Sequence, residues 1–308
     1  MRGMSRRRFL RKTGRLLSVT ALAGCPIGCV GPAARRGFRF AMCNESMRDL
    51  SWAEQCRIIG GAGYAGVEIA AFTLVDKGVQ EITDARRTEM VRIMDHNGLV
   101  CAGLHWLLAP PPEGLHFTTP ERTVRDRTVD YFKHLIDFCA DLGGRAMIFG
   151  SPKQRNAMGI STGQATDYFA ESLSRVADHA AQREVMILIE PLDRSQTDVV
   201  NTLSEALSLA EAVDHPAVSV MFDFHNTADE TESFETLIRK YYPHIGHVHV
   251  QEMDGRHLGT GTAHRDFKKA FSTLRELGYD RWVSLEVFDF TPSGRRIAEE
   301  SMAVLQEL

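Results

Sequence analysis

Eight short apolar runs alternate with longer amphipathic stretches along most of this 308-residue chain, and this alternation constrains its fold more than any other feature. The amphipathic stretches repeat apolar residues at helical spacing, and several end in Gly or Asn-Gly, as helix C-termini do. A last helix is predicted over 294–307. The predicted strands cover residues 38–43, 66–69, 99–105, 145–149, 185–190, 218–223, 245–250 and 282–286.

Eight strand–helix units over about 250 residues predict an α/β fold, a single-domain (β/α)8 TIM barrel spanning residues 38–308. A doubly wound open sheet is the alternative. Such a sheet commonly carries a GxGxxG turn after its first strand, but here the first predicted strand runs into AMCNES (41–46). We therefore favour the barrel.

The first 24 residues have the composition of an export signal. SRRRFLR (5–11) contains paired arginines, and LLSVTALAGC (16–25) is an apolar stretch too short to span a bilayer. The segment resembles a twin-arginine signal, which carries folded proteins across the bacterial inner membrane. Its end, LAGC, resembles a lipobox with Cys25 as the lipidated residue. The alternative is the basic leader of a cytoplasmic protein.

Residues 25–37 are rich in Gly, Pro and Ala and are predicted to form a flexible tether. We expect the protein to be exported, either periplasmic or lipid-anchored, with the anchor at Cys25 as its membrane contact. Positions 1–24 hold seven basic residues and no acidic one, so the remaining chain carries 29 basic against 40 acidic residues, a formal charge of −11. Nucleic-acid binding needs a basic surface, so this charge argues against it.

The cysteines indicate no disulfide framework. Beyond Cys25 there are five, none of them in a CxxC pair and several inside predicted strands or helices. Buried single thiols are therefore the expected state of these residues. The five are Cys29, Cys43, Cys56, Cys101 and Cys139.

Polar and charged residues stand at or just after the predicted strand ends, where the active site of a TIM barrel lies. They are Asn44, Glu68, His105, Lys153, Glu190, Asp223, His249 and Glu286. Several carboxylates gathered in one crevice raise one another's pKa unless a cation lies between them. The last four strands contribute three carboxylates and one imidazole, a ligand set that suits Mn²⁺, Mg²⁺ or Co²⁺.

Each of these four residues also has a purely structural interpretation. Glu190 is in a position to cap a loop, Asp223 to form an Asx turn, His249 to pack as a histidine bonded to a backbone carbonyl, and Glu286 to pair with an arginine. The histidine is ambiguous in another way, because His247 and His249 point to the same side of their strand and spacing alone cannot choose between them.

The segments around these residues resemble the xylose isomerase-like barrel superfamily, and within it the ketose 3-epimerases. The most specific segments are GYAGVEI (63–69), GLHWLL (103–108), LIEPLDR (188–194), FDFHN (222–226), HVHVQE (247–252) and GYDRWVSLEVF (278–288). The resemblance implies that Glu190, Asp223, His249 and Glu286 are the metal ligands, with the second histidine of HVH as the ligand. Mn²⁺ is the metal it favours, with Mg²⁺ or Co²⁺ as alternatives.

The resemblance also implies roles in catalysis. Glu190 and Glu286 are expected to move a proton between the two faces of an open-chain sugar through a cis-enediolate. His225 and Arg256 are expected to bind substrate oxygens, and Trp106 to line the pocket. Glu68 and His105 are expected to contact the distal hydroxyls.

Three positions depart from the family pattern. Gln196 stands where the epimerases usually have Glu, one residue rather than two separates Asp223 from His225, and Arg256 falls one residue late. These departures question epimerisation of a simple ketohexose, and export favours a free or oxidised sugar, or a small glycoside, over a sugar phosphate. The alternatives are a non-catalytic sugar-binding barrel and an endonuclease IV-like hydrolase. A homo-oligomer is compatible with this interpretation.

Overall fold

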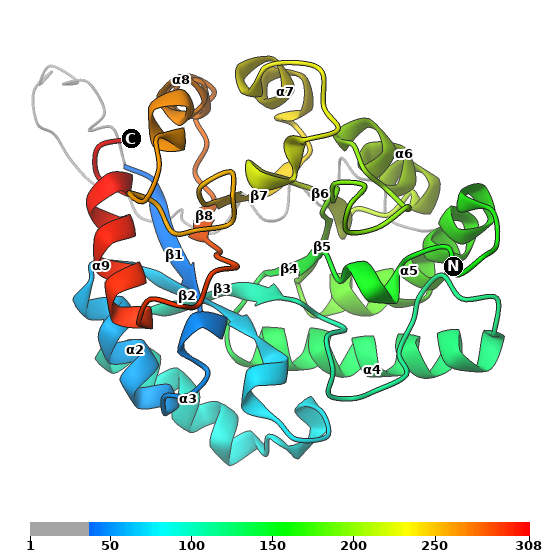
Figure 1. The fold of residues 1–308 in the computed structure, drawn as a ribbon. Helices are drawn as coiled ribbons and strands as arrows, with labels where there is room; N and C mark the ends of the chain where they lie inside the picture. Colours follow the sequence, from blue (N-terminus) through cyan, green and yellow to red (C-terminus); the bar gives the residue numbers. More distant parts are fainter. Residues whose placement is uncertain (1–36) are drawn as a thin grey trace, which may run out of the picture. The chain divides into compact units, whose positions relative to one another are not determined.

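The computed structural model describes residues 37–308, and the compact unit within it is Phe38–Leu308. Eight parallel strands pair in sequence order, and β1 also pairs with β8, which closes the barrel. The helices surround this ring of strands (Figure 1). The closure confirms the predicted (β/α)8 fold and rules out the open sheet. The predicted export signal and nearly all of the tether lie outside the described residues.

The strands lie within one residue of their predicted bounds at each end. They are β1 (Arg39–Cys43), β2 (Gly66–Ala70), β3 (Val100–His105), β4 (Ala146–Phe149), β5 (Met186–Ile189), β6 (Val218–Asp223), β7 (Ile245–Val250) and β8 (Trp282–Leu285). Such runs are almost entirely apolar because a barrel strand is covered on both faces.

Eight α-helices are described within residues 37–308. They are α2 (Trp52–Gly61), α3 (Asp84–His96), α4 (Arg122–Asp141), α5 (Thr162–Gln182), α6 (Leu203–Val213), α7 (Phe234–Tyr241), α8 (Ala263–Glu276) and α9 (Gly294–Leu305). Side-chain caps fix where several of them begin. Ser51 and Thr202 form capping boxes with Glu54 and Glu205, which satisfy N–H groups that a helix start leaves unpaired.

Alternation along the strands separates two apolar layers. A small cluster of Ala146, Ile148, Leu188 and Met221 is distinct from the large core, which includes the intervening strand residues and the apolar faces of the helices. Because successive side chains of a strand point to opposite faces, Glu190 and Asp223 share the face of Leu188 and Met221. The barrel interior is therefore apolar toward the amino ends of the strands and charged at their carboxyl ends.

The pairing of β6 with β7 is irregular. Val220 pairs with Ile245 and Phe222 with Val248, so β7 contains one extra residue between these pairs. Gly246 lies in this bulge, where a Cβ atom would collide with the side chain of Leu188. Beyond the bulge the register places Asp223 opposite His249.

The four described cysteines, Cys43, Cys56, Cys101 and Cys139, are free and buried, as predicted. Cys25 and Cys29 lie outside the described residues. None of the helices within residues 37–308 has the length and apolar character needed to cross a bilayer.

Candidate active site

Four residues from consecutive strands converge at the carboxyl end of the barrel. Glu190 directly follows β5, Asp223 ends β6, His249 lies in β7, and Glu286 directly follows β8. One ligand atom from each lies within 4.8 Å of those of the other three, and all four residues are buried. Backbone hydrogen bonds hold the two glutamates in place, from Glu190 N to Phe149 O (3.3 Å) and from Glu286 N to Val250 O (3.4 Å).

Asn226 bridges two of the carboxylates. Its Nδ2 donates to Glu190 Oε1 at 3.1 Å and to Asp223 Oδ2 at 2.6 Å. Its Oδ1 accepts from Nε2 of Gln196 at 2.6 Å, so the glutamine that departs from the family pattern supports this bridge. The sequence analysis missed Asn226, although it stands in FDFHN directly after His225.

The imidazole of His249 is held between two carboxylates. Its Nδ1 is 3.0 Å from Glu286 Oε2 and its Nε2 is 2.9 Å from Glu68 Oε1. Nδ1 therefore faces the four-residue cluster, while Nε2–H can donate to Glu68, as the second nitrogen of a metal-binding histidine usually does. His247 lies outside this cluster: its Nε2 contacts Glu68 Oε2 at 2.7 Å and Ser284 Oγ at 2.8 Å.

Burial and mutual repulsion shift the pKa values of these carboxylic acids. Burial, together with the charges of Glu286 and Asp223, raises the pKa of Glu190 well above its usual range. Burial also raises the pKa of Asp223 to about 6, with a further contribution from Glu286. Burial alone would raise the pKa of Glu286 as well, but His249 lowers it. Three buried carboxylates repel one another unless a cation lies between them, because little water is present to screen their charges.

The donor set fits a hard divalent cation. Three carboxylates and one imidazole offer mostly oxygen ligands, and Asn226 and Glu68 orient them from behind. Glu190, Asp223, His249 and Glu286 would hold the ion. Two further groups of potential ligands within the described residues include Cys43.

A cavity of about 310 Å³ opens beside the cluster. Glu190 and Glu286 line it, together with three residues that carry aromatic rings: Trp106, His225 and Phe288. Trp106 and His225 are predicted substrate contacts, whereas Phe288 is not. Trp106 Nε1 donates to Glu286 Oε1 at 2.7 Å, and Phe288 lies against the rings of both Trp106 and His225. His225 Nδ1 has no hydrogen-bond partner within residues 37–308, which leaves it available to a ligand oxygen.

The other predicted substrate contacts lie elsewhere. Glu68 and His105 are fully buried and do not line this cavity; Glu68 contacts both histidines of β7, and His105 Nε2 is 2.8 Å from Glu45 Oε2. Arg256 is exposed and bonds to Asp254 at 2.8 Å. The substrate-binding roles of these three residues stay predictions.

Arg155 is a second residue that the sequence analysis missed. Its guanidinium is fully buried and donates to the backbone carbonyls of Phe149, Glu190 and Val200. It thereby ties the ends of β4 and β5 to the loop that follows β5. A single arginine in a loop has no sequence signal that distinguishes this role from an ordinary surface position. Lys153, which was noted at the same strand end, does not line the cavity.

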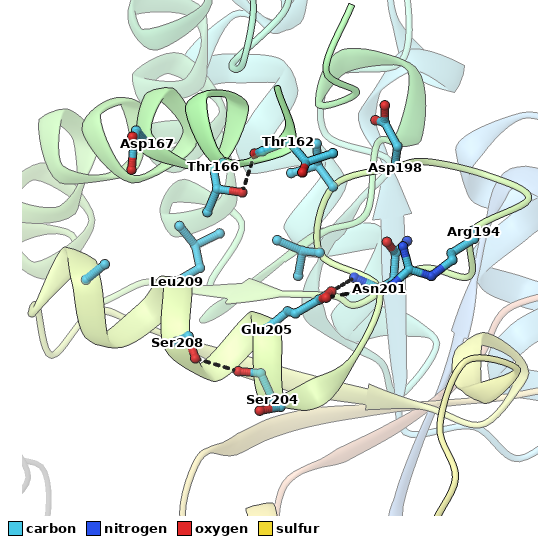
Figure 2. Close-up of a pocket in the computed structure, with 14 residues that line it drawn as sticks. Thr162, Thr166, Asp167, Arg194, Asp198, Asn201, Ser204, Glu205, Ser208 and Leu209 are labelled. Carbon is cyan, nitrogen blue, oxygen red and sulfur yellow. Dashed lines mark hydrogen bonds and ion pairs between the residues drawn. The ribbon is translucent and has the colours of Figure 1, made fainter. Parts of the chain in front are cut away.

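A second, larger cavity of about 440 Å³ lies between α5, α6 and the loop before α6, and none of the predicted site residues line it. Figure 2 shows three local bonds among its polar groups: Glu205 accepts from Asn201 N, Thr166 donates to Thr162 O, and Ser208 donates to Ser204 O. No group in it matches the convergence seen at the barrel mouth.

Comparison with known proteins shows that the chain is similar to sugar epimerases and related isomerases. The family model described as the xylose isomerase-like TIM barrel matches residues 56–308. A probable ketose 3-epimerase from Synechocystis is 24% identical over 218 residues, which cover 64% of this chain and 74% of that protein. A putative hydroxypyruvate isomerase from Danio rerio is 26% identical over 247 residues, covering 78% and 84%.

Solved structures share the fold. The crystal structure of a D-psicose 3-epimerase in the presence of D-fructose superposes with a TM-score of 0.75 at 18% identity, covering 88% of this chain and 98% of that one. That of the 3-keto-D-glucoside 4-epimerase from E. coli has a TM-score of 0.74 at 19% identity, covering 88% and 100%.

Proposed function

Because this chain belongs to the xylose isomerase-like TIM barrel family, we propose that it is a divalent-metal-dependent sugar isomerase or epimerase acting on a non-phosphorylated sugar. Its relatives are epimerases and isomerases, and the chain is an enzyme of this class. The observation that carries the finer proposal is the convergence of Glu190, Asp223, His249 and Glu286 beside a cavity that two of them line.

Glu190 and Glu286 are the proposed acid–base pair. They follow β5 and β8 and both face the cavity. One takes a proton from the carbon next to the sugar carbonyl, which yields a cis-enediolate, and the other returns a proton. Return to the opposite face of the same carbon is epimerisation, and return to the neighbouring carbon is isomerisation.

Mn²⁺ is the proposed metal, with Mg²⁺ or Co²⁺ as alternatives, because the donors are three carboxylates and one imidazole. When bound, such an ion polarises the sugar carbonyl and acidifies the adjacent C–H. Trp106 and Phe288 offer aromatic faces to the C–H groups of the ring or chain, and the free Nδ1 of His225 is positioned to bind a hydroxyl.

The lining of the cavity supports a substrate without phosphate. Neither lysine nor arginine is among the described residues that line it, and phosphate groups in proteins are usually held by such cations. The relatives with solved structures act on a free ketose in one case and on a keto-glucoside in another. A keto-sugar, free or as a small glycoside, is therefore the substrate class we propose.

Solvent exchange tests this proposal. The purified protein is incubated with Mn²⁺ and a panel of free sugars, keto-sugars and keto-glycosides in D₂O, and NMR detects deuterium at a carbon-bound position. We expect incorporation with at least one member of the panel. Glu286→Gln should abolish it, because the amide cannot accept the proton and is a poorer metal ligand.

Glu299→Gln is the matched control, since Glu299 is a solvent-exposed residue of α9 whose ion pair in the described part of the chain is with Arg295. It should leave incorporation unchanged. Exchange that survives Glu286→Gln would remove Glu286 from the mechanism, and a panel without any exchange would overturn the proposed reaction class.

We also propose that the protein is exported through its twin-arginine segment and anchored by a lipid at Cys25. The support is the sequence of residues 5–25. Arg6→Lys combined with Arg7→Lys should leave the precursor in the cytoplasm, and Cys25→Ser should move the exported protein from the membrane to the soluble fraction. Normal export of the double variant would contradict the signal, and an unchanged fractionation of Cys25→Ser would contradict the anchor.

A further inference from the structure

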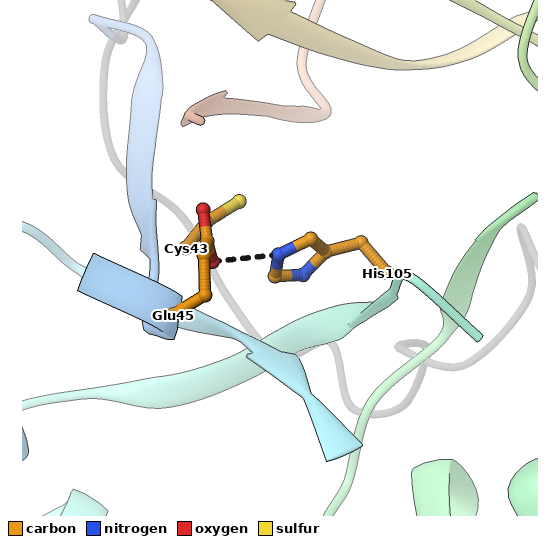
Figure 3. Close-up of side chains that lie close together, drawn as sticks. All are labelled: Cys43, Glu45 and His105. Atoms are coloured by element: carbon orange, nitrogen blue, oxygen red, sulfur yellow. Dashed lines mark hydrogen bonds and ion pairs between the residues drawn. The ribbon is translucent and has the colours of Figure 1, made fainter. Parts of the chain in front are cut away.

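A second group of potential metal ligands lies on the opposite side of the barrel mouth from β5 and β6. Cys43 ends β1, Glu45 begins the short turn η1 (Glu45–Met47) that follows it, and His105 ends β3. One ligand atom of each lies within 4.8 Å of the other two. Figure 3 shows the sulfur, the carboxylate and the imidazole turned toward one another.

All three side chains are buried, yet their bonding capacity is incompletely used. His105 Nε2 contacts Glu45 Oε2 at 2.8 Å, but Glu45 Oε1 has no hydrogen-bond partner among the described residues, and His105 Nδ1 has only an ion-pair contact of 3.5 Å with Glu68 Oε1. Glu45 is 2% exposed and His105 is fully buried, so water does not compensate for these atoms at the protein surface. A buried polar atom without a partner destabilises the fold, and such atoms are rare in native proteins.

The chemistry of this group differs from that of the four-residue cluster. It combines one thiol, one carboxylate and one imidazole, whereas the cluster has three carboxylates and no sulfur. Sulfur and nitrogen donors favour Zn²⁺ and similar borderline-soft cations over Mn²⁺ or Mg²⁺. Three protein ligands with a fourth position for water is a common arrangement for zinc.

The geometry requires only a small adjustment. Bonds of about 2.0–2.2 Å from a tetrahedral zinc to N and O separate those two donors by about 3.3 Å. The 2.8 Å contact between His105 and Glu45 would therefore open by about half an ångström. Glu45 lies in the turn after β1 and outside the pairing of β1 with β2 and β8, so its carboxylate can make this adjustment.

We propose that Cys43, Glu45 and His105 form a second metal site, separate from the proposed catalytic centre and selective for Zn²⁺ or Co²⁺. Glu68 lies between the two sites, because its Oε1 is 3.5 Å from His105 Nδ1 and 2.9 Å from His249 Nε2. A cation held by His105 thus fixes the surroundings of the carboxylate that orients His249. Its role is to support the geometry of the first centre.

Cobalt substitution tests this site directly. The protein is purified from cells grown with Co²⁺, so that a buried ion can enter during folding, and its metal content and absorption spectrum are measured. We expect about two ions per chain and a thiolate-to-cobalt charge-transfer band. Zn²⁺ supplied in excess during growth should remove the band.

Variants assign the band to its ligands. Cys43→Ser should abolish it and remove one ion per chain, whereas Cys56→Ser, which alters another buried thiol, should leave both unchanged. Asp223→Asn should weaken the first centre and keep the band, so a failure of the proposed catalytic site remains distinguishable from a failure of this one. If Cys43→Ser does not fold, Glu45→Gln provides the second variant and should weaken the band.

The spectrum of the unaltered protein decides the matter in any case. A cobalt-loaded protein without a charge-transfer band, or with a band that survives Cys43→Ser, would overturn the proposal. In that outcome the three residues are a hydrogen-bonded histidine–glutamate pair beside an inert thiol.

Discussion

The indole of Trp106 donates a hydrogen bond of 2.7 Å to Oε1 of Glu286, although the two residues are 180 positions apart in the chain. Trp106 adopts a φ of 50°, a conformation that bulky residues rarely adopt, so the surrounding structure holds its ring in place. The bond favours the ionised form of Glu286 and fixes the oxygen that faces the cavity.

Trp106→Phe should therefore slow proton exchange. A hydrogen bond to a charged group contributes about 1.5–3 kcal/mol, which corresponds to a loss of about tenfold or more in the rate of deuterium incorporation. Trp52→Phe is the control, because the Trp52 indole donates to Met90 O far from the site. The control should lower the melting temperature and preserve the exchange rate; equal rates in both variants would dismiss the role of Trp106.

The two histidines of β7 should differ in their effect on metal binding. His249→Gln removes a member of the four-residue cluster and should abolish Mn²⁺ binding measured by calorimetry. His247→Gln should keep binding within about tenfold, as loss of an indirect contact does. It should mainly lower the free energy of unfolding, by about 1–3 kcal/mol, because Glu68 loses one partner. A reversed order of the two variants would make His247 the ligand.

Gly150→Ala should disturb the centre without touching a ligand. A Cβ atom at Gly150 would collide with Oε2 of Glu190, so the carboxylate must turn away. Displacement of a catalytic group by about 1 Å can reduce a rate by about 100-fold, and Mn²⁺ affinity should fall as well. Gly163→Ala is matched to it, because nothing lies within 4 Å of its Cβ position. Retention of full activity by Gly150→Ala would show that Glu190 is mobile.

The loop before α4 should lose stability at acidic pH, because His116 becomes protonated. Its Nδ1 accepts from Thr118 N at 3.2 Å and its Nε2 lies 3.1 Å from Asn156 Oδ1, so the ring is neutral with the proton on Nε2. Burial lowers the pKa of His116 below its ordinary value of 6.5. The unfolded state consequently binds a proton first, and the stabilisation present above pH 6.5 is lost as the pH falls below it.

Amide hydrogen exchange at Thr118 measures this effect. Protection should decrease from pH 7 toward pH 5 by more than the intrinsic change in exchange chemistry accounts for. His116→Gln can still accept from Thr118 but does not titrate, so its protection should be independent of pH in this range. Identical pH profiles for the two proteins would contradict the assignment.

The barrel and the four-residue cluster were predictable because they rest on local patterns. Buried strands are short apolar runs, and the carboxyl ends of barrel strands meet, so Glu190, Asp223 and Glu286 had to lie close together. The choice between His247 and His249 was not available from residue patterns, since alternation gives both the same side. The two rings differ in a contact that only the folded chain makes: His249 Nδ1 lies 3.0 Å from Glu286 Oε2, whereas His247 Nε2 contacts Glu68 and Ser284.

Residues that act through nonlocal contacts escaped the sequence analysis. Asn226 and Arg155 have ordinary local surroundings in sequence, and their roles come from bonds to Glu190 that only the folded chain creates. The surroundings of Glu68 likewise depend on nonlocal contacts that local sequence patterns do not show. Its contact with the substrate stays a prediction, and in the folded chain its carboxylate faces the two histidines of β7 inside the barrel.

The extra residue in β7 has a consequence for how this enzyme tolerates change. Side chains in a strand swap faces with every single step, and deleting that residue would restore a regular ladder in which Val248 stays opposite Phe222 and His249 stays opposite Asp223. The direction of the imidazole thus depends on the regular pairing of Val248–Val250 with β8, and the irregularity before it is where the strand can lose one residue without turning that side chain away.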